Sequence, residues 1–227
     1  MLHVNRVLMM LWFKKKYIND ISIDISKKEL KKRVKILVVD DEQEQFPTKH
    51  LQDSGYTIEW WNEITPEKLE RMESGHFDII FLDIKGIADK NISETDGLGI
   101  INRVKSVNPF QIVIAFSGHS YDLSKTEFWK LADDTLAKPV TIIKAKELID
   151  RIIEEKITIE HYWRAIYAIL QKNGVSEKKI RKVEALLVDM IEKRDVKPYI
   201  ILEMIQATLQ NSAAIVTLIE GIKRIWI

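Results

Sequence analysis

The central half of the chain contains five short apolar runs, and a segment with helically spaced apolar residues follows each of them. The runs are rich in β-branched and aromatic residues, and most lack the alternation of a half-exposed strand, which is typical of buried parallel strands. The pattern predicts strands at residues 35–39, 56–60, 77–84, 111–116 and 135–137.

Capping residues and glycine stop signals predict helices between these strands. Thr65 is a cap residue with Pro66 at the first helical position, and Gly55 and Gly75 are placed to end helices. The predicted helices span residues 43–54, 65–75, 98–106, 125–131 and 142–155. This alternation predicts an α/β fold, a doubly wound five-stranded parallel sheet with helices on both faces.

The rest of the chain has no comparable strand pattern and is predicted to be all-α. Helices are predicted at residues 158–172, 176–194 and 198–225, the last with a bend near Asn211 and Ser212. We therefore divide the chain into a basic extension (residues 1–33), an α/β domain (residues 34–155) and a helical domain (residues 156–227).

Charge is segregated along the chain, although the formal net charge is only +1. Residues 1–35 carry a net +7, residues 36–155 a net −10 and residues 156–227 a net +4. Such segregation allows electrostatic contact between the segments or with partners. The chain has no cysteine, which excludes disulfides and thiolate metal sites.

The apolar run at residues 7–13 is too short to cross a bilayer, which takes about twenty residues. The lysines at 14–16 follow this run rather than precede it, which does not fit a signal peptide. We expect no transmembrane segment and a cytoplasmic protein. Leu8, Leu11 and Trp12 have helical spacing, and intramolecular docking of the extension is favoured over contact with an anionic membrane.

Five polar residues fall at the predicted carboxyl ends of strands: Asp40, Asp41, Asp83, Ser117 and Lys138. Ligands of doubly wound sheets bind beyond these strand ends, so residues far apart in sequence are expected to meet there. The set fits phosphoryl transfer to a carboxylate, which needs a nucleophile, a divalent cation and donors to the phosphoryl oxygens.

Each residue has a predicted role in that chemistry. Asp83 is the candidate nucleophile, and Asp40 and Asp41 offer, together with Asp83, the hard oxygen ligands that suit Mg²⁺. Ser117 and Lys138 are the candidate donors to the phosphoryl group. Taken singly, each of the five would be read as a turn, cap or solvated residue.

The segments ILVVDDE, IIFLDI, DGLGII, AFSG and AKPV, in this order, resemble the receiver domain of response regulators in two-component signalling. The resemblance covers about residues 34–155 and implies a flavodoxin-like fold. It also implies a phosphoprotein that receives its phosphoryl group on Asp83 from a histidine kinase or a phosphotransfer protein of a phosphorelay. By this resemblance the chain is a signalling switch and not an enzyme.

The sequence departs from the family in three places. The interval between Asp83 and Asp96 is longer than usual and lacks the customary proline. Lys85 stands where the family uses a backbone carbonyl on the metal, and its side chain is expected to counter the acidic cluster or to steer phosphate. Thr135 replaces a frequent aromatic switch residue.

Other functions remain open. A receiver-shaped scaffold that is never phosphorylated is one, and a metal-dependent phosphatase with an aspartyl nucleophile is disfavoured because Lys85 replaces its second aspartate. A phosphoryl-donating His161 is disfavoured because no kinase ATP-binding domain is evident. Trp60 and Trp61 are read as packing residues.

The helical domain is predicted to bind a protein partner or to form a homodimer. The apolar stretch from Tyr199 onward must be covered by other helices or by another chain. DNA binding is less favoured, because no terminal hairpin is evident and the basic cluster at 178–182 also fits the solvated face of a helix. The apolar stripe of that helix is Ile180, Val183, Leu186, Leu187, Met190 and Ile191.

Overall fold

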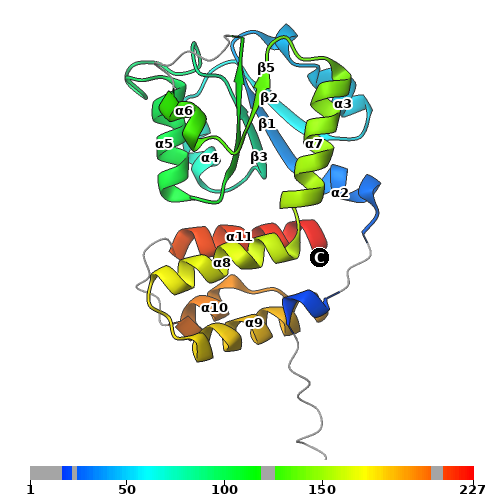
Figure 1. The fold of residues 1–227 in the computed structure, drawn as a ribbon, viewed down its shortest axis with the longest axis vertical. Helices are drawn as coiled ribbons and strands as arrows, with labels where there is room; N and C mark the ends of the chain where they lie inside the picture. Colours follow the sequence, from blue (N-terminus) through cyan, green and yellow to red (C-terminus); the bar gives the residue numbers. More distant parts are fainter. Residues whose placement is uncertain (1–16, 22–24, 119–125, 206–211) are drawn as a thin grey trace, which may run out of the picture.

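A five-stranded parallel sheet forms the centre of one half of the molecule (Figure 1). The computed structural model describes residues 17–21, 25–118, 126–205 and 212–227. The strands are β1 (Lys35–Val39), β2 (Thr57–Trp61), β3 (Ile79–Leu82), β4 (Ile112–Ser117) and β5 (Asp134–Ala137). Their order is β2-β1-β3-β4-β5, the flavodoxin-like order of doubly wound sheets. The predicted α/β class is therefore confirmed.

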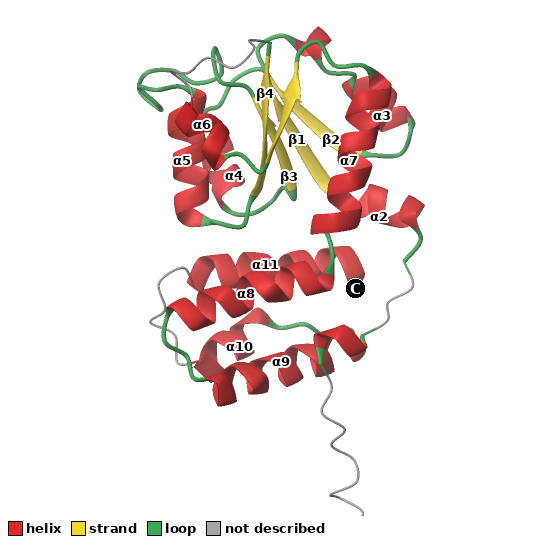
Figure 2. Ribbon diagram, viewed as in Figure 1, coloured by secondary structure: helices red, strands yellow, loops and turns green. Residues whose placement is uncertain are grey.

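Helices cover both faces of the sheet (Figure 2). One face packs against α3 (Thr48–Asp53) and α7 (Ile142–Lys156), and the other against α4 (Pro66–Glu73), α5 (Gly97–Val107) and α6 (Thr126–Leu131). Successive residues of a strand serve opposite faces, so that Val38 packs on the α3 and α7 side and Val39 on the other. Because both faces are buried, these strands lack the alternation of apolar and polar residues.

The helix predicted at residues 43–54 is shorter in the structure. A single 3₁₀ turn, η2 (Gln43–Gln45), comes first, and α3 begins only at Thr48. Pro47 lies between them as the residue that caps α3. Proline has no N–H to donate and clashes with the preceding turn, so it separates the two elements.

Part of the basic extension is ordered against the rest of the chain. A 3₁₀ turn, η1 (Ile18–Asp20), buries Ile18 among the carboxyl-terminal helices. Helix α2 (Lys27–Arg33), which the sequence reading did not predict, binds α7 through Lys31 to Asp150 at 2.8 Å and Lys27 to Glu154 at 2.5 Å. The residues on which docking was predicted, Leu8, Leu11, Trp12 and the lysines at 14–16, lie outside the described residues.

The carboxyl-terminal part of the chain is helical, as predicted, and we call residues 159–226 the helical region. It contains α8 (Ile159–Lys172), α9 (Glu177–Glu192), α10 (Pro198–Ile205) and α11 (Ser212–Trp226). Helices α8 and α11 lie next to the sheet, and α9 and α10 lie beyond them (Figure 1). The stretch predicted as one bent helix is thus two helices, with Asn211 outside the described residues. None of the described helices is long and apolar enough to cross a bilayer.

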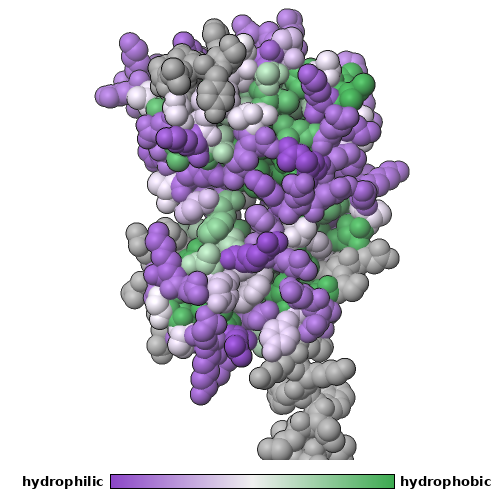
Figure 3. Space-filling view, in the orientation of Figure 1, coloured by the Kyte–Doolittle hydropathy of each residue, from purple (hydrophilic) through white to green (hydrophobic). Residues whose placement is uncertain are grey.

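The apolar faces of these helices are covered within the chain. In α9 the predicted stripe is buried, except that Leu186 is half-buried. Four isoleucines of α11 are completely buried: Ile215, Ile219, Ile222 and Ile225. The visible surface is mostly hydrophilic over both halves, with separate apolar patches (Figure 3). Other parts of the same chain therefore bury much of the apolar surface of the carboxyl-terminal helices.

Asp78 joins the two halves. It lies just before β3, and its carboxylate accepts hydrogen bonds from the Arg224 guanidinium at 2.6 and 2.7 Å and from the Tyr162 hydroxyl at 3.2 Å. The backbone N–H of Lys35 also donates to it, at 2.8 Å. Burial raises the pKa of Tyr162 well above its ordinary value, so this phenol stays a donor. The helical region is thereby attached to the amino-terminal edge of the sheet.

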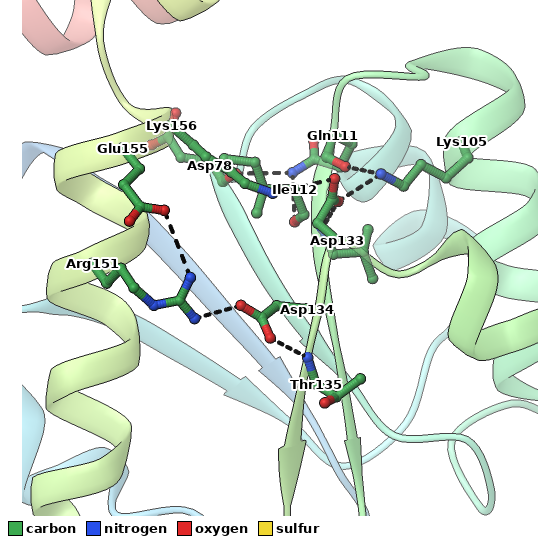
Figure 4. A network of polar contacts seen from close by, with 11 residues as sticks. Asp78, Lys105, Gln111, Ile112, Asp133, Asp134, Thr135, Arg151, Glu155 and Lys156 are labelled. Atoms are coloured by element: carbon green, nitrogen blue, oxygen red, sulfur yellow. Dashed lines mark hydrogen bonds and ion pairs between the residues drawn. The ribbon is translucent and has the colours of Figure 1, made fainter. Parts of the chain in front are cut away.

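A second polar network fixes α7 against β5 close to the connection with α8 (Figure 4). Arg151 of α7 binds Asp134, the first residue of β5, at 2.5 Å. The neighbouring Asp133 accepts from Lys105 of α5 at 2.6 Å and lies 3.6 Å from Lys156 at the end of α7. The end of α7, from which the helical region continues, is thus held by the sheet.

Candidate functional site

Three carboxylates converge at the carboxyl-terminal edge of the sheet, opposite the helical region. Asp40 and Asp41 follow β1, and Asp83 follows the neighbouring β3. One oxygen of each carboxylate lies within 4.8 Å of the others. Asp40 is fully buried, Asp83 is 7% exposed, and Asp41 is exposed. The sequence prediction that these residues meet is therefore correct in geometry.

Lys138 reaches the same cluster from the end of β5. Its ammonium group lies 2.8 Å from Asp40 Oδ1 and 2.6 Å from Asp83 Oδ2. Burial acts to lower the pKa of Lys138, but the hydrogen bonds to the two carboxylates outweigh it, so the pKa is raised. Lys138 thus stays charged and offsets part of the negative charge of the cluster. A cis peptide bond joins Lys138 to Pro139.

The cluster has the donor set of a site for a hard divalent cation. Carboxylate oxygens are the ligands that Mg²⁺ prefers, and the exposed Asp41 leaves room for the waters that this ion keeps. Asp40 Oδ2 is buried and has no hydrogen-bond partner among the described residues, whereas Oδ1 accepts from Lys138 and from the Glu42 N–H. Burial raises the pKa of Asp40, which a bound cation would counteract. The residues present therefore fit such an ion.

Ser117 is the last residue of β4, and it is buried at 4% exposure. Its register partner in β5 is Ala137, so Ser117 and Lys138 approach the cluster from adjacent strand ends. The backbone carbonyl of Ser117 accepts from the Lys138 N–H at 3.0 Å. All five residues that the sequence singled out thus lie at one edge of the sheet.

The departures from the receiver pattern have structural counterparts. Lys85 is exposed, and among the described residues the ion pairs of the acidic cluster are made by Lys138 and not by Lys85. Thr135 is exposed on β5.

The two neighbouring tryptophans of β2 are packing residues, as predicted. Trp61 packs against Phe77 with ring centroids 5.3 Å apart, and Trp60 packs against the core.

Sequence reasoning missed one residue near the site. Asp96 was read only as part of the entry into α5, but its carboxylate accepts three backbone hydrogen bonds from the loop after Asp83, at Gly86, Ile87 and Ala88. The signal was the long interval between Asp83 and Asp96, because a long loop needs internal polar contacts to adopt one conformation.

His161 lies away from this cluster. It is half-buried on α8 and lines the small cavity between the helical region and the amino-terminal edge of the sheet. Burial and the nearby Arg164 and Lys156 lower its pKa. The structure therefore gives no support for phosphoryl exchange between His161 and Asp83 within one molecule.

Comparison with known proteins gives matches among solved structures alone. No family model and no curated protein matches the chain. The chemotaxis protein CheY4 of Vibrio cholerae is 24% identical, covers 52% of this chain and 98% of its own length, and has a TM-score of 0.42. A receiver domain protein of Methanospirillum hungatei is 22% identical, with coverages of 54% and 94% and a TM-score of 0.44.

The response regulator TrrA of Thermotoga maritima, solved in complex with Mg²⁺ and BeF, is 26% identical over 52% of this chain and 98% of its own, with a TM-score of 0.40. The strand order β2-β1-β3-β4-β5 gives this chain the flavodoxin-like class. By their descriptions these three solved structures are a chemotaxis protein, a response regulator receiver domain protein and a response regulator. The fold class of this chain rests on its own strand order.

Proposed function

We propose that this protein is a response regulator that accepts a phosphoryl group on Asp83 from a histidine kinase or a phosphotransfer protein. The observation that supports the proposal most strongly is the convergence at the sheet edge: three carboxylate oxygens lie within 4.8 Å of one another, and Lys138 Nζ lies 2.6 Å from Asp83. This set supplies a nucleophile, ligands for a cation and a donor to phosphoryl oxygens.

In the proposed reaction a carboxylate oxygen of Asp83 attacks the phosphorus of a phosphohistidine. The new phosphorus–oxygen bond gives an acyl phosphate, and the phosphorus–nitrogen bond breaks with its electron pair going to the imidazole. Mg²⁺, when bound, neutralises charge on the phosphoryl oxygens. Asp40 and Asp41 would hold the ion, the first from the buried side and the second from the exposed side.

Lys138 and Ser117 would act on the transferred group. Lys138 contacts both Asp40 and Asp83, so it can exchange part of these contacts for a phosphoryl oxygen without a large movement. Ser117 lies at the adjacent strand end, from which its hydroxyl would donate to another phosphoryl oxygen.

We also propose that the helical region transmits the signal by protein association, as a homodimer or with a separate partner in the cytoplasm. Much of its apolar surface is covered within the chain, so the partner would use what remains outside, including Tyr199, which is 62% exposed at the start of α10. The exposed basic residues Lys178, Arg181 and Lys182 lie on α9 opposite its buried stripe and act as a solvated face.

Binding of beryllium fluoride tests the proposed site without a kinase. Isotope-labelled protein is titrated with beryllium fluoride and Mg²⁺, and amide shifts are recorded. We expect shifts after β1, β3 and β5 that disappear in Asp83→Asn and on removal of Mg²⁺. Shifts that persist in Asp83→Asn would contradict Asp83 as acceptor, and no binding by the wild type would favour the scaffold that is never phosphorylated.

A further inference from the structure

The loop between β3 and α5 lies directly against the exposed member of the carboxylate cluster. Gly86 packs so closely on Asp41 that a Cβ atom there would lie 2.5 Å from Asp41 Oδ2. No hydrogen bond among the described residues holds the Asp41 carboxylate. The loop at Gly86 therefore borders one side of the space open to this candidate ligand.

Asp96 fixes this part of the loop. Its Oδ2 accepts from the Gly86 N–H at 2.6 Å, and its Oδ1 accepts from the N–H groups of Ile87 and Ala88 at 3.2 and 3.0 Å. Hydrogen bonds to an ionised carboxylate are about twice as strong as those between neutral groups. One side chain thus holds three consecutive backbone amides.

Two of these three residues, Ile87 and Ala88, are also held by Ile64. The Ile64 N–H donates to the Ile87 carbonyl at 2.7 Å, and Ile64 and Ala88 form an isolated parallel bridge. Ile87 is completely buried. The segment 86–88 is thus enclosed between residue 64 and the Asp96 carboxylate, with Gly86 facing Asp41.

The backbone of Asp96 indicates that its side chain is needed at this position. Asp96 has φ 52° and ψ −128°, a conformation that costs energy for a residue with a side chain and that glycine adopts readily. The turn is tight, because a Cβ at the following Gly97 would lie 2.3 Å from the Asp83 carbonyl oxygen. A turn alone would favour glycine at residue 96, whereas the carboxylate bonds account for aspartate.

We propose that Asp96 is a positioning residue for the phosphorylation site. Its carboxylate holds segment 86–88 in the position in which Gly86 packs against Asp41. By restricting the orientation of Asp41 in this way, Asp96 raises the affinity of the carboxylate cluster for Mg²⁺. This inference rests on the proposed function, since it concerns the same site. Asp96 acts through the loop and does not itself ligate the ion.

Two substitutions distinguish the contribution of the Asp96 carboxylate from that of the backbone turn at residue 96. Asp96→Gly removes all three acceptor bonds but adopts the backbone conformation freely, and Asp96→Asn keeps a single carbonyl oxygen for the three amides. Asp89→Asn is the matched control, because Asp89 is an exposed carboxylate of the same loop that accepts from Asn91 and not from segment 86–88. Mg²⁺ affinity is measured by titration of amide shifts in the full chain, and amide hydrogen exchange is measured without Mg²⁺.

We expect Asp96→Gly to weaken Mg²⁺ binding by about tenfold or more, as is typical for partners that orient metal ligands. Asp96→Asn should lie between this variant and the wild type, and Asp89→Asn should match the wild type. Without Mg²⁺, the amides of residues 86–88 should exchange faster in Asp96→Gly while those of β1 and β3 stay protected.

Wild-type Mg²⁺ affinity in Asp96→Gly would overturn the inference and assign Asp96 to the turn alone, and so would unchanged exchange of residues 86–88. Absence of Mg²⁺ binding by the wild type would also overturn it. Mg²⁺ binding by the wild type without any beryllium fluoride adduct would instead contradict the proposed function and leave the role of Asp96 intact.

Discussion

Arg224 in α11 and Asp78 before β3 form a two-bond ion pair, with distances of 2.6 and 2.7 Å, across the two halves of the molecule. The four residues of β3 separate Asp78 from Asp83. The contact that attaches the helical region and the proposed phosphoryl acceptor thus lie at opposite ends of one buried strand.

Asp78→Asn should destabilise the full chain by about 2–3 kcal/mol. Loss of one partner of a buried ion pair costs about 3–5 kcal/mol, and the figure is lower here because the Arg224 side chain is 26% exposed. Urea unfolding at neutral pH measures the change. The exposed pair of Asp189 and Lys193 provides the control, since Asp189→Asn should leave stability nearly unchanged. Equal effects of the two substitutions would show that Asp78 does not hold the halves together.

Lys138→Met should have opposite effects on two properties of the site. Lys138 offsets part of the negative charge of Asp40 and Asp83, so its removal should raise the Mg²⁺ affinity of the cluster severalfold. Phosphorylation by acetyl phosphate should fall about a hundredfold or more, because a donor to the transferred group is lost. Titration and intact mass spectrometry measure the two quantities.

Lys85→Met is the control for this substitution, because Lys85 lies on the loop after Asp83 but does not contact the cluster. It should change both quantities much less. A lower Mg²⁺ affinity in Lys138→Met would mean that the lysine organises the carboxylates rather than competes with the ion.

The attachment of α2 should make stability depend on alkaline pH. Burial, together with the hydrogen bond from its hydroxyl to Asp150, raises the pKa of Tyr56 from 10.0 to about 12, and Lys31 of α2 donates to the same hydroxyl at 2.9 Å. Because the folded pKa is raised, the contribution of the phenol is complete below pH 10 and is lost as the pH rises toward 12.

Tyr56→Phe should therefore lose less stability than the wild type between pH 10 and 12, as measured by urea unfolding. The exposed Tyr199 supplies the matched control, and Tyr199→Phe should keep the wild-type profile. If Tyr56→Phe shows the wild-type slope, the interaction of α2 with Tyr56 and Asp150 does not contribute to stability.

The full chain should not bind a defined DNA duplex tightly. Only a few basic residues of α9 are exposed, so few contacts to DNA phosphates are possible. Binding through so few contacts is weak and is lost as the salt concentration rises. Fluorescence anisotropy at several salt concentrations tests this. Tight binding with a steep salt slope that Lys178→Gln, Arg181→Gln and Lys182→Gln remove would establish the DNA alternative.

The sequence predicted the sheet because parallel strands buried on both faces give apolar runs. It also predicted that five polar residues lie at one edge of the sheet, because each lies at the carboxyl end of a predicted strand. It placed Asp83 and Lys138 at one edge although they are 55 positions apart in the sequence. The helix predicted at 43–54 is too long because Gly55 signals only where it ends, and Pro47 delays its start. Helix α2 was not predicted because its polar residues give no apolar stripe.

The contacts that sequence reasoning missed join elements far apart in the chain. Asp78 and Arg224 are 146 residues apart, and nothing in the local pattern of either indicates a partner. Asp96 followed by glycine reads as an ordinary turn, so its three bonds to the loop appear only in three dimensions. The apolar stretch from Tyr199 onward predicted burial against other helices or another chain. A local sequence pattern does not tell which of the two buries it.

Intact mass of the full chain after incubation with acetyl phosphate and Mg²⁺ tests the central claim most directly. We predict an increase by the mass of one phosphoryl group in the wild type and none in Asp83→Asn. Asp89→Asn, in which an exposed carboxylate of the following loop is replaced, should be modified like the wild type. An adduct that persists in Asp83→Asn, or a wild type that gains no mass, would contradict the assignment of Asp83 as the phosphoryl acceptor.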